Sequence, residues 1–278
     1  MPTIRVTSPI KWHGGKYYLA PKLVPHLPKE YKHRVHAYGG GVNELFCWGG
    51  NGISEVINDC NHDLMNFWRV LQDKDMFEEF QRLCNVTPFA ELEFVDAKET
   101  LELVRKGNPV RLAHNFFVRC RQSRQGLMKD FATVSTSRIR RGMNEQVSAW
   151  LSSVEGLPAV HERLKRVMIL NEDALKVICE QDSPDTFFYL DPPYLGETRA
   201  VKDAYEYEMT PEQHQQLLDL LGTIEGKFML SGYPSDMYAQ AAKEYGWRHH
   251  DFDLPNNASS KKSKDRKIER IWMNYQAV

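Results

Sequence analysis

The stretch TFFYLDPPYLGE, residues 186–197, places a carboxylate and two prolines directly after five largely apolar residues. Each proline fixes its φ angle at about −65° and lacks a backbone N–H. The carbonyl groups of Asp191 and Pro192 and the Asp191 carboxylate therefore form a rigid set of hydrogen-bond acceptors, followed by the Tyr194 ring. Such a set suits a flat target with two N–H donors, which is the exocyclic amino group of a nucleobase.

This arrangement predicts a reaction at the amino nitrogen of the base. The amino nitrogen of adenine is a poor nucleophile, because its lone pair is delocalised into the ring. Fixed acceptors that hold both amino hydrogens favour a more tetrahedral nitrogen, and they do so without reorganising during the reaction. Tyr194 can stack on a base that has left the helix, which returns about 1–3 kcal/mol of the cost of extrusion. An Asp-Pro-Pro turn can also simply begin a loop. The apolar strand before it and the tyrosine after it favour a catalytic role over a purely structural one.

A glycine run and a second carboxylate indicate a ligand that carries a nucleoside. Gly39, Gly40 and Gly41 follow the strand-like stretch HRVHAY, and Asp59 ends the next one, ISEVIND. A carboxylate one strand after a glycine loop can accept hydrogen bonds from the hydroxyls of a ribose. The plainer alternatives are a tight turn for the glycines and a helix N-cap for Asp59. No G-x-x-x-x-G-K-[ST] motif is present, so ATP hydrolysis is not supported.

Alternating strands and helices are expected to position these residues. Further strands are predicted at RVMIL, TFFYL and KFMLS, each short, apolar and buried, and helices at residues 62–72 and 210–224. This alternation predicts an α/β, doubly wound, Rossmann-like sheet, whose ligands bind at the carboxyl ends of the strands. The stretches WRHHDFDL and RIWMNY predict an antiparallel hairpin at the sheet edge.

The alternation is broken between Phe67 and Arg163, where helices and loops are expected. We therefore predict an inserted, mainly helical module at 67–163 within a domain formed by 1–66 and 164–278. The window from Arg105 to Arg141 holds ten basic residues against one acidic residue, Asp130, a net charge of +9 in a chain whose net charge is −1. Such a window is typical of a phosphate-binding surface, although a solvated helical face would look similar.

Taken together, the motifs resemble those of the DNA adenine methyltransferases of the Dam-like, D12 class. The stretch DPPY resembles the fourth motif of amino-group DNA methyltransferases, and KWHGGK at residues 11–16 resembles the N-terminal signature of the D12 class. The motif order also matches, and the resemblance extends from about residue 9 to the last predicted strand. DPPY alone leaves cytosine N4 open beside adenine N6.

The resemblance implies S-adenosylmethionine as the methyl donor and gives each matching residue a role. Asp191 matches the catalytic acid, within the motif Asp191, Pro192, Pro193 and Tyr194. Asp59 matches the acid that binds the ribose, and Asp173 matches one beside the adenine of the cofactor. The residues implied to bind the cofactor are Trp12, Lys16, Tyr38, Gly39, Gly40, Gly41, Asp59, Asp173 and Asp191. Lys11 matches a position near DNA, and SGY at 231–233 resembles a motif that shapes the pocket for the base.

One position departs from the family pattern. Where the family often has Glu-Pro-Phe before the glycines, this chain has His36, Ala37 and Tyr38. In the family that glutamate commonly faces the amino group of the methionine, so the ammonium needs other acceptors here. This departure motivates a second hypothesis, a catalytically weakened DNA-binding protein of the same fold. A cytosine-N4 or RNA methyltransferase is a third.

Double-stranded DNA is the expected partner, bound through the predicted insert. Its segments FFVRCRQSRQG (116–126) and STSRIRRGMN (135–144) interleave arginines with Ser, Thr and Gln, which suits phosphates and base edges. The residues predicted to bind DNA are Lys11, Arg119, Arg121, Arg124, Arg138, Arg140 and Arg141.

Length and composition argue against several classes of protein, including membrane-spanning, secreted and disulfide-rich proteins. The chain has 278 residues, no run of 18 apolar residues and no apolar signal core at its N-terminus. The five cysteines include no C-x-x-C pair, so neither a disulfide framework nor a zinc site is indicated. We expect a cytoplasmic protein of a bacterium or phage, a monomer or weak dimer, that needs no metal.

Overall fold

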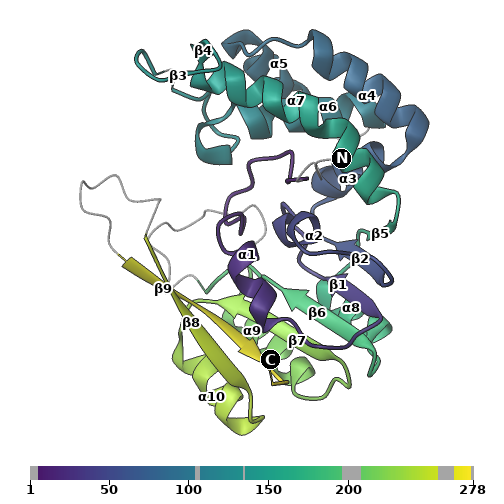
Figure 1. Cartoon of the computed structure of the whole chain (residues 1–278), viewed down its shortest axis with the longest axis vertical. Coiled ribbons are helices and arrows are strands. Elements are labelled where there is room, and N and C mark those ends of the chain that lie inside the picture. The colour runs from purple at the N-terminus through teal and green to yellow at the C-terminus, as the bar shows by residue number, and fades with distance from the viewer. Residues whose placement is uncertain (1–5, 104–106, 134, 196–207, 256–265, 277–278) are drawn as a thin grey trace. The chain divides into compact units, whose positions relative to one another are not determined.

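The computed structural model describes residues 6–103, 107–133, 135–195, 208–255 and 266–276. The chain divides into two compact units, each assembled from separate stretches of sequence. The first unit comprises Met1–Lys22, Gly40–Asn51 and Asp59–Asn171, and the second comprises Leu23–Gly39, Gly52–Asn58 and Glu172–Val278. Figure 1 labels the helices and strands of both.

The second unit contains a mixed sheet in the order β2-β1-β6-β7-β9-β8 (Figure 1). Its strands are β1 (His33–His36), β2 (Ser54–Asn58), β6 (Thr186–Leu190), β7 (Lys227–Gly232), β8 (Arg248–Pro255) and β9 (Arg266–Met273). Strands β2, β1, β6 and β7 run parallel, whereas β9 is antiparallel to both β7 and β8. The helices of this unit are α8 (Ala174–Gln181), α9 (Pro211–Leu221) and α10 (Asp236–Glu244), preceded by a 3-10 turn at Val24–His26. Helix α1 (Ala20–Leu23) spans a boundary between the units.

Strand β6 lies between β1 and β7 and is buried along its whole length. This burial explains its continuous apolar run, because a strand covered on both faces has no solvent side for polar residues. Strands β1 and β2 hold a charged pair, Arg34 of β1 and Glu55 of β2, which are register partners and form a fully buried ion pair. A buried ion of this kind is tolerated only when it is paired.

Strands β8 and β9 form the predicted hairpin, with β8 at the sheet edge. Ion pairs join the two strands, between Arg270 and Asp251 and between Arg266 and Asp253, each at 2.6 Å. Charged side chains on an edge strand discourage pairing with another chain. The polar loop predicted at 256–267 lies almost wholly outside the described residues.

The first unit is mainly helical. It contains α2 (Asn43–Cys47), α3 (His62–Gln72), α4 (Lys74–Val86), α5 (Glu91–Leu103), α6 (Pro109–Gln122), α7 (Glu145–Leu164), a 3-10 turn at Arg124–Gly126, and strands β3 (Ile139–Arg140), β4 (Met143–Asn144) and β5 (Val167–Leu170). Aromatic rings fill its core: Phe67 stacks on Phe117 at 5.8 Å, and Phe117 contacts Trp150 at 5.2 Å. Helix α3 therefore packs against α6 and α7.

The sequence did not predict the small hairpin formed by β3 and β4 in the first unit. Its two-residue turn has positive φ at Arg141 (55°) and Gly142 (74°), the combination of a type I′ turn that suits the twist of a hairpin. Arg141 forms an ion pair with Glu155 of α7 at 2.8 Å. Ile139 and Arg140 are exposed.

The predicted Rossmann-like α/β fold with an antiparallel C-terminal hairpin is confirmed. The prediction that RVMIL is a buried strand is wrong: β5 forms, but Met168 is 56% exposed and only Val167 is fully buried. The division into a 67–163 target-recognition insert and a 1–66 plus 164–278 catalytic domain stays a prediction, and its bounds differ from those of the compact units. None of the described helices is long and apolar enough to cross a membrane.

Candidate functional site

The Asp191-to-Tyr194 corner lies directly after β6, as predicted. Asp191 is half-buried, Pro192 and Tyr194 are buried, and the strand before them has no exposed residue. Asp191 is therefore the first residue at the carboxyl end of this strand that is not fully buried. This end of a parallel strand is where ligands bind in open α/β sheets.

The corner packs against SGY, the segment that ends β7. The Tyr194 hydroxyl lies 3.4 Å from Ser231 Oγ, and the Tyr194 ring meets the Tyr233 ring edge to face at 4.5 Å. The structure thus brings together two motifs that are 37 residues apart in the chain. Burial, followed by the charges of Asp191 and Glu269, raises the pKa of Tyr194, so its hydroxyl stays protonated.

The end of β1 carries Tyr38 and Gly39 in the second unit. Tyr38 is half-buried, and the Gly39 N–H donates to the carbonyl of Asn58 at 2.7 Å. His36, which stands where the family often has glutamate, is 1% exposed and meets the Tyr189 ring at 5.7 Å. His36 is therefore a core side chain in this structure.

Asn58 is a structural residue that the sequence did not single out. Its fully buried side chain donates to the carbonyls of Ala37 (3.0 Å) and Glu172 (3.1 Å) and accepts from the Glu172 N–H (2.9 Å). Asn58 thus fixes the end of β1 to the segment that carries Asp173. The only signal in the sequence was a buried-strand position occupied by an amide, immediately before Asp59.

Asp173 caps α8. Its side chain accepts from the Lys176 N–H at 3.1 Å, and the residue is exposed. The helix cap accounts for Asp173 without a cofactor. Its implied contact with the adenine of a cofactor stays a prediction.

In the first unit, Trp12 of the KWHGGK motif packs on the glycine run. A Cβ atom built on Gly40 would lie 2.8 Å from Trp12 Nε1, and one built on Gly41 would lie 2.8 Å from Trp12 Cβ. Gly40 also has a φ of 50°, which favours glycine. Glycine is therefore required here for close approach, so a turn alone does not account for the run. Lys16, from the same motif, is 7% exposed and donates to the Gly14 carbonyl at 3.0 Å.

Asp59 joins the glycine run to the start of α3. Its carboxylate accepts from the Gly40 N–H and the Asn61 N–H, both at 2.9 Å. Asn61 accepts from the Leu64 N–H and is the N-cap of α3, so the alternative role predicted for Asp59 belongs to Asn61, two residues further on. The pKa of Asp59 is raised by burial, although the hydrogen bonds from the Asn61 and Gly40 N–H groups oppose the increase. The structure thus leaves Asp59 as a half-buried acceptor beside the glycine loop.

Lys11 lies against the helical part of the first unit. Its ammonium group donates to the Arg121 carbonyl at 3.3 Å and to Gln146 Oε1 at 3.2 Å. Burial and the Arg121 charge lower the pKa of Lys11 to about 8, against the opposing effect of Glu145. Gly126 has a φ of 74° and covers the backbone of Lys11, because a Cβ there would lie 2.3 Å from the Lys11 carbonyl oxygen. Lys11 is therefore held in place by the chain itself.

The six arginines predicted to bind DNA differ in exposure. Arg121 donates to the Ala149 carbonyl at 2.7 Å, and burial lowers the pKa of its guanidinium to about 10. Arg119 donates to the Met128 carbonyl at 2.9 Å and is half-buried. Both guanidinium groups are thus bonded to backbone oxygens, and their contact with DNA stays a prediction.

The other four arginines of this set are exposed. Arg124 donates to Thr133 Oγ1 at 2.8 Å, Arg138 pairs with Glu145 at 3.3 Å, and Arg141 pairs with Glu155 at 2.8 Å. Arg140 stands next to the hairpin turn. These side chains can reach a polyanion without unfolding the unit. Arg105 and Lys106 of the basic window lie outside the described residues.

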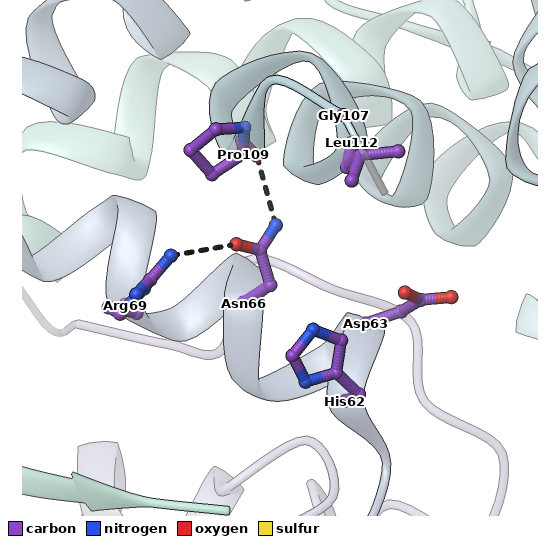
Figure 2. Close-up of a pocket in the computed structure, with 7 residues that line it drawn as sticks. All are labelled: His62, Asp63, Asn66, Arg69, Gly107, Pro109 and Leu112. Carbon is purple, nitrogen blue, oxygen red and sulfur yellow. Dashed lines mark hydrogen bonds between the residues drawn. The ribbon is translucent and has the colours of Figure 1, made fainter. Parts of the chain in front are cut away.

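A cavity of about 240 Å³ lies in the first unit between α3 and the start of α6 (Figure 2). It is lined by His62, Asp63, Asn66, Arg69, Gly107, Pro109 and Leu112. Asn66 crosses it, donating to the Pro109 carbonyl at 2.9 Å and accepting from Arg69 at 3.5 Å. None of the predicted site residues lines this cavity. Within the described residues, no three His, Cys, Asp or Glu side chains gather as metal ligands.

Comparison with known proteins gives one family and two relatives of similar length. Residues 12–250 match the family described as D12 class N6 adenine-specific DNA methyltransferase. The type II methyltransferase M1.LlaDCHI of Lactococcus lactis subsp. cremoris is 24% identical over 277 residues, covering 95% of this chain and 94% of the relative. The type II methyltransferase M.MjaIII of Methanocaldococcus jannaschii is 24% identical over 289 residues, covering 96% and 98%. The family match covers both the KWHGGK and DPPY motifs, apart from Lys11.

Proposed function

We propose, since this chain belongs to the D12 class N6 adenine-specific DNA methyltransferase family, that it transfers a methyl group from S-adenosylmethionine to an adenine turned out of double-stranded DNA. That the chain is a DNA methyltransferase follows from the family and its relatives. The proposal adds the donor, the extruded base and the roles of the residues. The observation that supports it most is the position of Asp191, a half-buried carboxylate residue directly after the buried strand β6.

The residues of the first unit fit the proposed donor. The glycine loop packs against Trp12 so closely that no side chain could replace Gly40 or Gly41 without moving the indole. Asp59 sits beside this loop as an acceptor suited to ribose hydroxyls. When bound, S-adenosylmethionine supplies a methyl group activated by a positive sulfonium. We assign its binding in this unit to Trp12, Lys16, Gly40, Gly41 and Asp59. The roles that the family resemblance implies for Tyr38, Gly39, Asp173 and Asp191 stay predictions.

Asp191 and the two prolines are assigned to the amino group of the base. The carboxylate and the carbonyls of Asp191 and Pro192 would accept hydrogen bonds from its two N–H groups, which would favour a tetrahedral nitrogen whose lone pair is available for methylation. These acceptors are rigid, so little reorganisation opposes the reaction. Tyr194 is assigned to contact with the extruded base.

Transfer of tritiated methyl groups to unmethylated genomic DNA tests the proposal. We expect incorporation with the wild-type protein and a loss of at least about 10²-fold with Asp191→Ala, since single groups that stabilise a transition state contribute about this much. Asp185→Ala is the matched control, because Asp185 lies just before the same strand, is exposed and pairs with Lys32. It should retain incorporation.

The product and the binding data separate the alternatives. Nucleoside digestion should yield N6-methyladenine, whereas N4-methylcytosine would identify a cytosine enzyme and label found only in RNA an RNA enzyme. Tight DNA binding without any methyl transfer would identify a catalytically weakened protein. That hypothesis is based on His36, which stands where the family often has glutamate. The type II names of the two relatives support a place in a restriction-modification system.

A further inference from the structure

Behind the DPPY corner, a buried carboxylate from the C-terminal hairpin binds the Tyr194 hydroxyl. Glu269 of β9 is 9% exposed, and its Oε1 accepts a hydrogen bond from the Tyr194 hydroxyl. The same oxygen accepts from Ser231 Oγ at 3.3 Å. Two hydroxyl groups from separate motifs therefore meet on one carboxylate oxygen, in a place where an unsatisfied charge would be costly.

The sheet explains how Glu269 reaches this place. Strand β9 is antiparallel to β7, with Ile271 as the register partner of Ser231. Side chains two residues apart on a strand share a face, so Glu269 and Ile271 point to the same side of the sheet. The pairing with β8 sets Glu269 opposite Phe252 and fixes its position along the strand.

The ring of Tyr194 is held as well as its hydroxyl. Tyr233 meets it edge to face at 4.5 Å, and the Lys267 ammonium lies 4.5 Å above the Tyr233 ring. Burial and the nearby carboxylates raise the pKa of Tyr194, so the hydroxyl remains a donor to Glu269 at all ordinary pH values. Position and orientation of the ring are both determined by neighbours within the second unit.

We infer that Glu269 is a positioning residue of this methyltransferase: it fixes Tyr194 in the orientation that receives the extruded base. The inference rests on the proposed function, which gives Tyr194 its contact with the base. Glu269 acts through the Tyr194 hydroxyl, and it does not touch the methyl donor. Glu269 lies outside the KWHGGK, DPPY and SGY motifs.

A double-mutant cycle on methyl transfer tests this inference. Glu269→Ala and Tyr194→Phe should each lower kcat by about 10- to 100-fold, since a misplacement near 1 Å can cost up to 10²-fold. The double variant should be no slower than the slower single variant, because each change breaks the same hydrogen bond. Glu269→Gln keeps an acceptor oxygen and should restore most of the activity. Equilibrium binding of S-adenosylmethionine, measured by calorimetry, should stay within about threefold of wild type, because the bond removed lies outside the cofactor contacts proposed here.

Asp251→Ala serves as the matched control. Asp251 belongs to the same hairpin and binds Arg270 at 2.6 Å, so the variant weakens the hairpin without touching Tyr194. A loss of activity with Asp251→Ala equal to that with Glu269→Ala would assign the effect to hairpin stability and overturn the inference. Additive losses in the double variant, or full activity of Glu269→Ala, would also overturn it while leaving the proposed function intact. A wild-type protein without methyl transfer would overturn both.

Discussion

Gly40→Ala tests the contact between the glycine run and Trp12. The new methyl group meets two separate costs. Gly40 has a φ of 50°, and the left-handed conformation costs an L-residue about 1–2 kcal/mol. The added Cβ would also lie 2.8 Å from Trp12 Nε1 and 3.0 Å from Trp12 Cδ1, and overpacking of this kind costs about 1–3 kcal/mol. We expect a total loss of about 2–5 kcal/mol in the free energy of unfolding.

Gly52→Ala isolates the first cost. Gly52 also has a positive φ, 80°, but a Cβ there meets nothing within 4 Å. This control should lose only about 1–2 kcal/mol. Denaturant titration gives both stabilities, and calorimetry with S-adenosylmethionine should show weakened binding for Gly40→Ala alone, because Trp12 must move.

Trp12→Ala provides the cross-check. In that background the indole is gone, so Gly40→Ala should cost no more than Gly52→Ala does. The packing of Trp12 on the glycine run would be refuted by equal losses for Gly40→Ala and Gly52→Ala in the wild-type background, with cofactor binding unchanged in both.

Three further predictions concern charged residues. Burial and the Arg121 charge lower the pKa of Lys11 from 10.5 to about 8, so the unfolded chain binds its proton more tightly than the folded protein does. The free energy of unfolding should therefore rise with pH between about 8 and 10.5. Lys11→Met should remove that rise in denaturant titrations, and an unchanged pH dependence would contradict the burial of Lys11. Arg140→Gln should reduce the slope of log affinity for DNA against log salt by about 0.9, and an identical slope would place the phosphate contacts elsewhere. Glu55→Ala should lower the free energy of unfolding by about 3–5 kcal/mol by leaving Arg34 buried without its carboxylate, whereas a loss below about 1 kcal/mol would argue against the buried pair.

Local sequence patterns predicted the strands and helices that have a strong periodic or capping signal. The helix at 62–72 forms with the predicted bounds. Thr210 and Gln213 form a capping box at the start of α9, with Pro211 as the first helical residue. These features depend on interactions between residues a few positions apart, so the local sequence is enough to predict them.

Burial was harder to predict where its cause lies far away in the chain. An apolar run of four or five residues predicts a strand at β5, but exposure of Met168 depends on which elements cover it. Arg121 looks like a DNA contact in the sequence, yet it donates to the carbonyl of Ala149, and no sequence motif marks a backbone acceptor 28 residues away. Glu269 lies in a stretch rich in charges, so its burial beside Tyr194 could not be seen before the register of β9 was known.

The sequence identified the motif residues of the site but left their local partners open. It placed Asp59 at the end of a strand and named two roles for it, ribose binding or a helix cap. In the structure, Asn61 caps the helix. Asp59 instead accepts a hydrogen bond from the Gly40 N–H. Which of two polar residues, two positions apart, caps a helix depends on the exact turn, and a sequence pattern does not resolve a shift of that size.

The path of the chain has a consequence for dissecting this protein. The backbone passes from one compact unit to the other five times, and one of these passages falls within the glycine run, between Gly39 and Gly40. No single cut can therefore release either unit as a continuous fragment: a polypeptide starting at Glu172 would lack β1 and β2. Truncated clones should yield unfolded or aggregating material, and a helical module built for separate expression would need its distant N-terminal segments rejoined through artificial linkers.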